Sequence, residues 1–465
     1  MTTEHSPSSE AGRGASSLRG LANGGVFLPG DEEYDRARTT WALAVDLRPA
    51  AVAFPKDAEE VAGVVRAAAS AGLRVAPVGT GHNAHPLGDL SGSVLLRTSG
   101  MAGIEIDADA RRARVEAGAL WLPVVEKVAT HGLAALHGSS PDVGVVGYLL
   151  GGGFGWYSRS LGLAANSVTA VELVTADGAL IRVDAQHEPE LFWALRGGGG
   201  ANFGAVTAVE FTLYPIETAY AGMLAWDLRD AHRVLSRWAP WSVEAPDAVT
   251  TSYRHLQFPP IPDIPEPFRG RQLVVIDGAV LADDAEARRI LAPLRELEPE
   301  IDTFARVPAP ALARIHMDPE QPTPGGGRSS LLDEFPPAAV DRLVEVAGAE
   351  SGSSLFLAAE LRQLGGALGR TPPGAGAMAK LDGQFQLITG GLMVGELAAQ
   401  TVADCTRVVS AMAPYSRGRE YLNFQEEPVD PSTGYDAATW EELVRIRGAV
   451  DPTGLFQANH EIPHS

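Results

Sequence analysis

Three glycine-dense segments constrain the fold of this chain more than any other feature of its sequence. They cover residues 79–83, 138–156 and 196–204, and each lies between strongly apolar stretches. Consecutive backbone N–H groups in such a loop form a cradle for an anion, and glycine lets the backbone adopt positive φ and approach a phosphate closely. One such loop is typical of a flexible connection. Three of them indicate close approach of the backbone to a large ligand, or of backbone to backbone.

The segments lack the patterns of several familiar sites. None contains Gly-x-Gly-x-x-Gly, the Rossmann fingerprint, and none is followed by the Gly-Lys-Ser/Thr of a P-loop. A nucleophile elbow around Ser140 would need glycine at position 142, where the chain has Asp142. The single cysteine, Cys405, lies in an apolar helical pattern and is predicted to be an inert buried thiol, which leaves no Cys–His nucleophile.

Charge and composition exclude several classes of function. The 465-residue chain has a net charge of −21, which repels both the phosphate backbone of nucleic acids and anionic membrane surfaces. It has no run of about 18 apolar residues that would span a membrane. The Ser- and Gly-rich N-terminus lacks the apolar core of a signal peptide, and one cysteine fits a reducing compartment. We therefore expect a cytoplasmic protein with a disordered tail over residues 1–24.

The apolar pattern changes character near Pro215. Before it, short strands alternate with helices, among them a helix that begins at the capping box of Asp57 and Glu60 and a hairpin with Asp177-Gly178 at its turn. After it, longer strands predict one antiparallel sheet with helices on one face, so the fold class is α+β. Strands are expected in this second part near residues 272–281, 355–361 and 385–388, and helices near 283–291, 338–346 and 396–412.

The ordered set of segments resembles the PCMH-type FAD-binding fold that vanillyl-alcohol oxidase shares with the berberine bridge enzymes. Gly81-His82 resembles the family triplet, Gly-Gly-His or similar, whose histidine bonds to the flavin. The second glycine segment resembles the region that contacts the pyrophosphate and isoalloxazine, and residues 195–207 resemble the end of the FAD domain. Near the C-terminus, residues 421–424 and 451–456 resemble the berberine-bridge signature. The matches extend from about residue 29 to 462, which is nearly the whole chain.

The resemblance implies two domains, of which the first is discontinuous. It predicts a two-subdomain FAD-binding domain of the PCMH type over residues 25–217 and a substrate-binding domain with a large antiparallel sheet backed by helices over 218–417. Residues 418–465 would form a berberine-bridge segment that returns to the FAD domain. The cleft between the domains is the expected site, because ligand pockets favour domain junctions.

The resemblance also implies that FAD is attached to the protein through His82. Some members carry a second covalent link through a cysteine in the second segment, where this chain has Ser140, so one link is predicted. Two alternatives stay open for His82. It could be an ordinary loop histidine, or it could pair with His85 in a metal site, although only Asp89 lies nearby to complete a zinc set. No metal is therefore predicted.

The resemblance assigns a longer set of residues to cofactor binding, drawn from the first two glycine segments, one later strand and the C-terminal signature. In chain order these are Val78, Gly79, Thr80, Gly81, His82, Asn83, Pro86, Leu87, Gly138, Ser139, Ser140, Val143, Gly144, Gly147, Tyr148, Gly151, Gly152, Gly155, Val206, Tyr421 and Asn423.

Two residues are candidates for the catalytic base that takes a proton while hydride leaves to the flavin. Members that oxidise alcohols or sugars use a tyrosine, which points to Tyr421, although Tyr421 could instead simply pack at the domain junction. Glu360 is the second candidate, on a strand expected to face the flavin. Alkaloid-forming members use a glutamate after a Gly-Gly pair, where this chain has Arg370. Arg370 could bind an anionic substrate or be a solvated surface residue.

These expectations define an oxidoreductase that passes hydride from an alcohol, amine or activated C–H bond of a small secondary-metabolite or sugar-type substrate to covalently bound FAD. Dioxygen would then reoxidise the flavin. A flavin-containing, non-redox cyclase or isomerase of a natural-product pathway is the alternative. A third possibility, an interaction protein without a cofactor, is disfavoured by the three glycine segments. The expected partners are the small-molecule substrate and dioxygen, with neither nucleic acid nor membrane.

Overall fold

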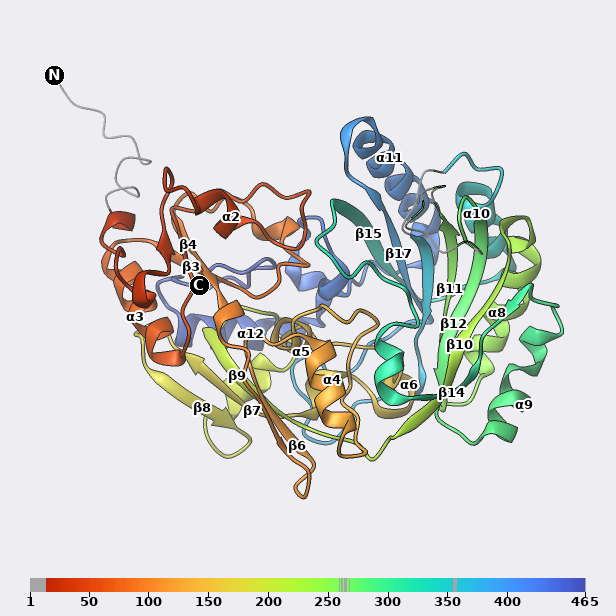
Figure 1. Cartoon of the computed structure of the whole chain (residues 1–465), viewed down its shortest axis with the longest axis horizontal. Coiled ribbons are helices and arrows are strands. Elements are labelled where there is room, and N and C mark those ends of the chain that lie inside the picture. The colour runs from red at the N-terminus through yellow and green to blue at the C-terminus, as the bar shows by residue number, and fades with distance from the viewer. Residues whose placement is uncertain are drawn as a thin grey trace.

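Three β-sheets organise the chain into two lobes that lie side by side in Figure 1. The computed structural model describes residues 14–258, 260, 262, 266, 268–353 and 358–464. The first lobe holds the two smaller sheets, from residues 26–97 and 104–212, together with the C-terminal segment. The second lobe is built around the largest sheet, from residues 218–392. Helices and strands are mixed in both lobes, which confirms the expected α+β class.

The first sheet is small and mixed, and its last strand leads into the first glycine segment. Helix α3 (Ala58–Ser70) follows β2, and the Asp57 side chain accepts a hydrogen bond of 2.9 Å from the backbone N–H of Glu60, as the capping pattern predicts. Strands β2 and β3 both pair with β4 in parallel. Along the sheet the order is β1 (Val26–Phe27), β2 (Ala51–Ala53), β4 (Ser93–Arg97) and β3 (Arg74–Val78).

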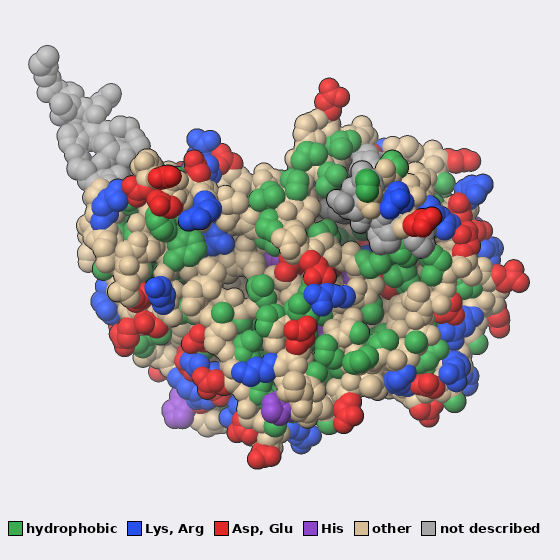
Figure 2. Space-filling view, viewed as in Figure 1, with side chains coloured by type: hydrophobic (Ala, Val, Ile, Leu, Met, Phe, Trp, Pro, Cys, Tyr) green, Lys and Arg blue, Asp and Glu red, His purple; other side chains and the backbone are tan. Residues whose placement is uncertain are grey.

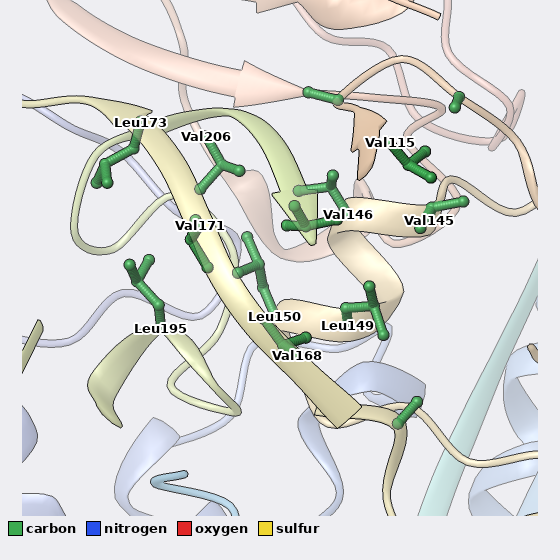
Figure 3. Packing of buried hydrophobic residues seen from close by; sticks show 14 of the residues in the cluster. Val115, Val145, Val146, Leu149, Leu150, Val168, Val171, Leu173, Leu195 and Val206 are labelled. Carbon is green, nitrogen blue, oxygen red and sulfur yellow. The ribbon is translucent and has the colours of Figure 1, made fainter. Parts of the chain in front are cut away.

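The second sheet carries the apolar support for the second glycine segment. Helix α5 (Val145–Leu150) lies over this sheet, and its Val146 and Leu150 side chains pack with Val171 and Val206 in a buried core (Figure 3). Strands β7 and β8 form the antiparallel hairpin expected around Asp177-Gly178. Helix α4 (Trp121–Ala129) precedes α5. The strand order is β5 (Ile104–Asp107), β6 (Arg112–Glu116), β9 (Ala205–Thr212), β7 (Val168–Val174) and β8 (Leu180–Asp184).

The third sheet is antiparallel throughout and has helices on one face, as the sequence predicts. Helices α8 (Ala231–Glu244), α9 (Asp284–Arg295) and α10 (Pro337–Ala347) lie on the side away from the first lobe (Figure 1), and α11 (Gly395–Met412) packs on α10, β15 and β17. Of the strand expected over residues 355–361, residues 355–357 lie outside the described residues. The strands are β10 (Thr218–Asp227), β11 (Val249–Gln257), β12 (Gln272–Val280), β13 (Ile301–Asp302), β14 (Ala305–Pro308), β15 (Gly325–Leu332), β16 (Ala358–Gln363) and β17 (Phe385–Leu392).

Strand alternation in β16 divides its residues between the two faces of the third sheet. Leu361 packs into the core beneath the helices, so Glu360 and Arg362 point to the opposite face. On that face Glu360 lies opposite Arg254 of β11 and Ile388 of β17. A row of polar and charged side chains therefore faces the first lobe.

The C-terminal segment returns to the first lobe after α12 (Ala437–Val450). Phe456 forms a parallel bridge with Val75, and the backbone N–H of Gln457 donates to the Val75 carbonyl at 2.8 Å. Cys405 is buried in α11, as expected. No described helix combines the length and apolar character needed to cross a membrane.

The expected disordered tail is wrong for residues 14–24. Ala15, Leu18 and Ala22 are buried and belong to the core around α3, and residues 22–24 form a short 3-10 helix. These three apolar side chains, although they stand among polar residues, are enough to pack the segment against the first lobe. The earlier part of the expected tail, residues 1–13, lies outside the described residues.

Candidate cofactor and substrate site

The first glycine segment presents free backbone donors at the end of β3. Within the described chain, none of the N–H groups of residues 79–83 donates a hydrogen bond, although the Thr80 carbonyl accepts one from Trp41. Gly81 has φ +78°, and a Cβ there would lie 2.6 Å from that of Thr40. Unpaired N–H groups in a partly exposed loop are suited to holding an anion.

The second glycine segment opens toward the same region at the start of α5. A Cβ built on Gly144 would lie 3.7 Å from the Thr80 side chain, and one on Gly147 would meet no atom within 4 Å. Gly147 is exposed, whereas Val146 and Leu149 on the same helix are buried. An open backbone surface therefore lies beside the first loop, and Figure 2 shows the molecular surface hollowed between the two lobes.

The other predicted glycines of this segment serve close packing within the protein. A Cβ on Gly138 would lie 3.0 Å from the Tyr148 ring, and one on Gly151 would overlap the Asn423 carboxamide. A Cβ on Gly155 would come within 2.1 Å of a backbone carbonyl. Gly151 therefore lets the C-terminal segment pack against α5, and Gly155 permits the close approach of backbone to backbone that the sequence left open.

The His82 side chain is fixed by two neighbours that the sequence did not indicate. Its imidazole stacks on the Trp41 indole at 3.9 Å between ring centroids and 20° between planes. Its Nε2 lies 3.3 Å from the Asp142 carbonyl oxygen and 3.4 Å from the Asp142 carboxylate. The same carboxylate accepts hydrogen bonds from the Trp41 indole at 2.5 Å and from the Ser140 hydroxyl at 3.0 Å.

Asp142 is ionised in this arrangement. Burial alone would raise its pKa, but the contacts with His82 and the hydrogen bonds from Trp41 and Ser140 lower the pKa below its ordinary value. Because Nε2 faces Asp142, the other imidazole nitrogen, Nδ1, is left without a hydrogen-bond partner among the described residues. A carboxylate beside Nε2 increases the electron density available at Nδ1.

Tyr421 is buried where the C-terminal segment meets the second glycine segment. Its hydroxyl oxygen accepts hydrogen bonds from the Gly153 backbone N–H at 2.7 Å and the Asn423 side chain at 3.2 Å. Burial raises the pKa of Tyr421, although the bonds from Asn423 and Gly153 and the charge of Arg362 act to lower it. A Cβ on Gly152 would lie 3.3 Å from the Tyr421 ring, so this glycine makes room for it.

Glu360 faces the first lobe, as expected, but it is held in a buried network of ion pairs. Its Oε1 accepts a hydrogen bond from Arg362 Nε at 2.7 Å and lies 3.3 Å from His316 Nε2. Burial alone would raise the pKa of Glu360, but Arg362 and His316 hold it well below its ordinary value. A carboxylate that is so stabilised is a weak proton acceptor, so the geometry favours a positioning role for Glu360 over that of base.

His316 connects the network to the second glycine segment. Its Nδ1 lies 2.8 Å from Asp277, which also pairs with Arg254, and its Nε2 lies 3.8 Å from Asp318. The Ser139 hydroxyl of the second glycine segment donates to Asp318 at 3.0 Å. Burial and Arg254 lower the pKa of His316, but the three carboxylates around it raise the pKa to about 9.

These ion pairs predict that stability falls at alkaline pH. Because the folded-state pKa of about 9 exceeds the ordinary value of 6.5, the contribution is complete below about pH 6.5 and is lost as pH rises through 9. The difference between the folded-state and ordinary pKa of His316 corresponds to a contribution of about 3 kcal/mol to the free energy of unfolding. The free energy of unfolding of both proteins should be measured from pH 6 to 10. We expect the wild type to be more stable than His316→Gln at pH 6, and most of this difference to be lost by pH 10. A constant difference between the two proteins would contradict the assignment.

Two glycines of the candidate site should respond oppositely to alanine. Gly81→Ala should lower the free energy of unfolding by about 2 kcal/mol or more, because of its positive φ and the contact with Thr40. Gly147→Ala should leave it unchanged or raise it by up to about 1 kcal/mol, since the position is helical and open. Urea denaturation of the flavin-free proteins measures both, and equal losses would contradict the geometry.

The remaining predicted residues divide between loop and core. Val78 ends β3, and Pro86 and Leu87 lie in the short 3-10 helix after the first loop, with Leu87 buried. The Val206 side chain is buried in β9 opposite Leu173, where it packs in the core beneath α5.

Comparison with known proteins agrees with this geometry. The family described as "FAD binding domain" matches residues 49–184. The chain is 26% identical over 460 residues to the "Uncharacterized FAD-linked oxidoreductase YvdP" of Bacillus subtilis, covering 95% of this chain and 98% of that protein. It is 37% identical over 204 residues, 44% of each chain, to the (R)-6-hydroxynicotine oxidase of Paenarthrobacter nicotinovorans. The structure of Physcomitrella patens BBE-like 1 shares the fold, with a TM-score of 0.82, 21% identity and coverage of 96% and 98% of the two chains.

The matches and the geometry together establish the class of protein. The unpaired N–H groups of the first loop and the open backbone at the start of α5 fit the phosphates of a dinucleotide. The expected resemblance to the berberine bridge enzyme-like, PCMH-type FAD oxidases is confirmed. The chain is an FAD-linked oxidoreductase, and FAD is its cofactor.

Proposed function

We propose that the protein is an oxidase that takes hydride from an alcohol, amine or activated C–H bond of a small secondary-metabolite or sugar-type substrate, with dioxygen as the final acceptor. One observation carries this proposal: Tyr421 lies between the second glycine segment and the charged face of the third sheet. Its hydroxyl contacts Gly153 on one side, and Phe424 joins its ring to Arg362 on the other. A proton acceptor in that position is what hydride removal requires.

FAD, when bound, supplies the hydride acceptor, and the side chains manage the proton. Tyr421 acts in its ionised form: the N–H groups of Gly153 and Asn423 stabilise the negative charge of the phenolate oxygen, which then takes the proton from the substrate and becomes neutral. The guanidinium of Arg362 adds a positive charge nearby. Glu360 and His316 hold that guanidinium in place.

The proposal includes a single covalent bond from His82 to the flavin. The stacked Trp41 ring fixes the plane of the imidazole, and the contacts of Nε2 with Asp142 leave Nδ1 as the nucleophilic atom. Ser140, where some relatives carry a second attachment, is engaged as a donor to Asp142. These contacts support the proposal of one covalent bond, at His82.

We also infer the division into an FAD domain of residues 25–217 and 418–465 and a substrate domain of residues 218–417. The third sheet begins at Thr218, and the bridge between Val75 and Phe456 returns the C-terminal segment to the first sheet. Limited proteolysis that released a folded fragment near either boundary would support this division.

Anaerobic mixing with a panel of alcohols, amines and oligosaccharides tests the proposed reaction. We expect at least one substrate to bleach the visible flavin band and admission of oxygen to restore it with formation of hydrogen peroxide. Bleaching without recovery in oxygen would make the protein a dehydrogenase. Conversion of a substrate without any bleaching would favour the non-redox cyclase or isomerase.

A further inference from the structure

Arg362 is the member of the buried network that reaches into the space between the lobes. Its side chain is 12% exposed, against 4% for Glu360 and 1% for His316. Its guanidinium lies 5.1 Å from the centre of the Phe424 ring, which in turn lies 5.4 Å from the Tyr421 ring. The cation therefore stands close to the proposed proton acceptor.

The guanidinium has more donors than its neighbours can use. Its Nε donates to Glu360, and its Nη2 lies 3.0 Å from His316 Nε2 and 3.5 Å from Glu360. Within the part of the chain that the structure describes, its Nη1 has no hydrogen-bond acceptor. An arginine side chain carries five N–H donors in a rigid planar fork, so one edge of this fork is unpaired.

The carboxylates near this fork already have partners. Glu360 contacts both Arg362 and His316, and Asp318 accepts a hydrogen bond from Ser139 and lies 3.8 Å from His316 Nε2. Asp277 is already occupied by Arg254 and His316. None of the contacts of these carboxylates among the described residues reaches Arg362 Nη1, so this edge of the guanidinium is left for a further acceptor.

We propose that Arg362 is a substrate-binding residue that anchors a carboxylate group of the substrate beside Tyr421. A singly charged, planar carboxylate matches the free edge of the guanidinium. The nearby Glu360 and the chain's overall charge of −21 disfavour a multiply charged anion such as a phosphate ester. This inference rests on the proposed oxidase function, since it specifies the substrate of that site.

The sequence offered a different arginine for this role. Arg370 is 62% exposed and pairs with Asp247 at the surface, so it is a solvated residue and not an anion site. It therefore supplies a matched control, because Arg370→Gln removes an arginine of the same domain without touching the cleft. Arg362→Lys provides a second variant, which keeps the charge but not the planar fork.

Calorimetric titration of the flavin-containing protein with benzoate and acetate, each compared with its amide, tests the inference. We expect at least one acid to bind tenfold or more tightly than its amide, and this preference to disappear in Arg362→Gln. Arg362→Lys should retain part of the preference, and Arg370→Gln should behave as the wild type. The visible flavin band of each variant confirms that it is folded and loaded.

Three results would overturn the inference: equal binding of acids and amides, an undiminished preference in Arg362→Gln, or no binding of either acid to the wild type. The proposed oxidase function fails separately. A flavin-loaded protein that binds benzoate through Arg362, but whose flavin no carboxylate-bearing alcohol or amine reduces, would refute the oxidase and keep the anion site.

Discussion

Replacing Tyr421 by phenylalanine should lower kcat/KM by about 10²- to 10⁴-fold, the range contributed by a positioned general base. The substitution removes the oxygen on which the Gly153 and Asn423 donors converge, while the ring packing against Phe154 and Phe424 remains. Because burial raises the pKa of Tyr421, kcat/KM of the wild type should increase with pH. The variant should lose this dependence, which a pH profile of steady-state rates would show.

Tyr435→Phe is the matched control for this prediction. Tyr435 is also buried, and its hydroxyl donates to the Gly197 carbonyl at 2.9 Å, so its loss removes one structural hydrogen bond. We expect that variant to lose about 1 kcal/mol of stability and little activity. Tyr421 would be a packing residue, the alternative that the sequence left open, if both variants lowered kcat/KM equally and only slightly.

Replacing His82 by alanine should abolish covalent attachment of the flavin. The imidazole Nδ1 is the nucleophile in this account, and alanine has no substitute for it. Asp142→Asn should slow attachment about tenfold or more, since a charge-assisted contact of this kind contributes about 1.5–3 kcal/mol. Fluorescence of denaturing gels, recorded during incubation of flavin-free protein with FAD, measures the rate for each variant.

His85→Ala separates attachment from general disturbance of the loop. His85 lies three residues after His82, and both of its ring nitrogens are buried without a hydrogen-bond partner among the described residues. This variant should attach flavin at the wild-type rate. Covalent flavin in His82→Ala, or its loss in His85→Ala, would move the attachment point away from His82.

Local sequence signals account for most of the fold and for the outline of the site. The capping contact of Asp57 with Glu60 and the hairpin at Asp177-Gly178 are decided by a few neighbouring residues, so a pattern can show them. Strand alternation similarly places Glu360 on the face toward the first lobe. The same alternation puts Arg362, two residues later, beside it, and that signal was present in the sequence.

Local sequence patterns could not predict which residues contact the site residues and shift their pKa values. Trp41 and Asp142 are 101 positions apart, and Ser139 and Asp318 are 179 apart, so only the packed lobes bring them together. For the same reason the sequence offered Glu360 as a free base, whereas the fold pairs it with Arg362 and His316.

The error at the N-terminus arose because its apolar residues are few. Ala15, Leu18 and Ala22 do not give a clear apolar pattern, yet all three are buried in the same core as the apolar side chains of α3. The glycines of the second segment have two different structural roles. Some leave the backbone open toward the cleft, and others make room for the side chains of Tyr148 or Asn423. Composition alone does not distinguish these two uses.

The most direct test of this account is the visible spectrum of the purified protein before and after precipitation in acid. The account predicts flavin absorption bands in the native protein and yellow colour that stays in the washed pellet. Colour that passes to the supernatant would remove the bond to His82 while keeping the FAD site. A colourless protein that takes up no added FAD would contradict the central claim that this chain is an FAD-linked oxidoreductase.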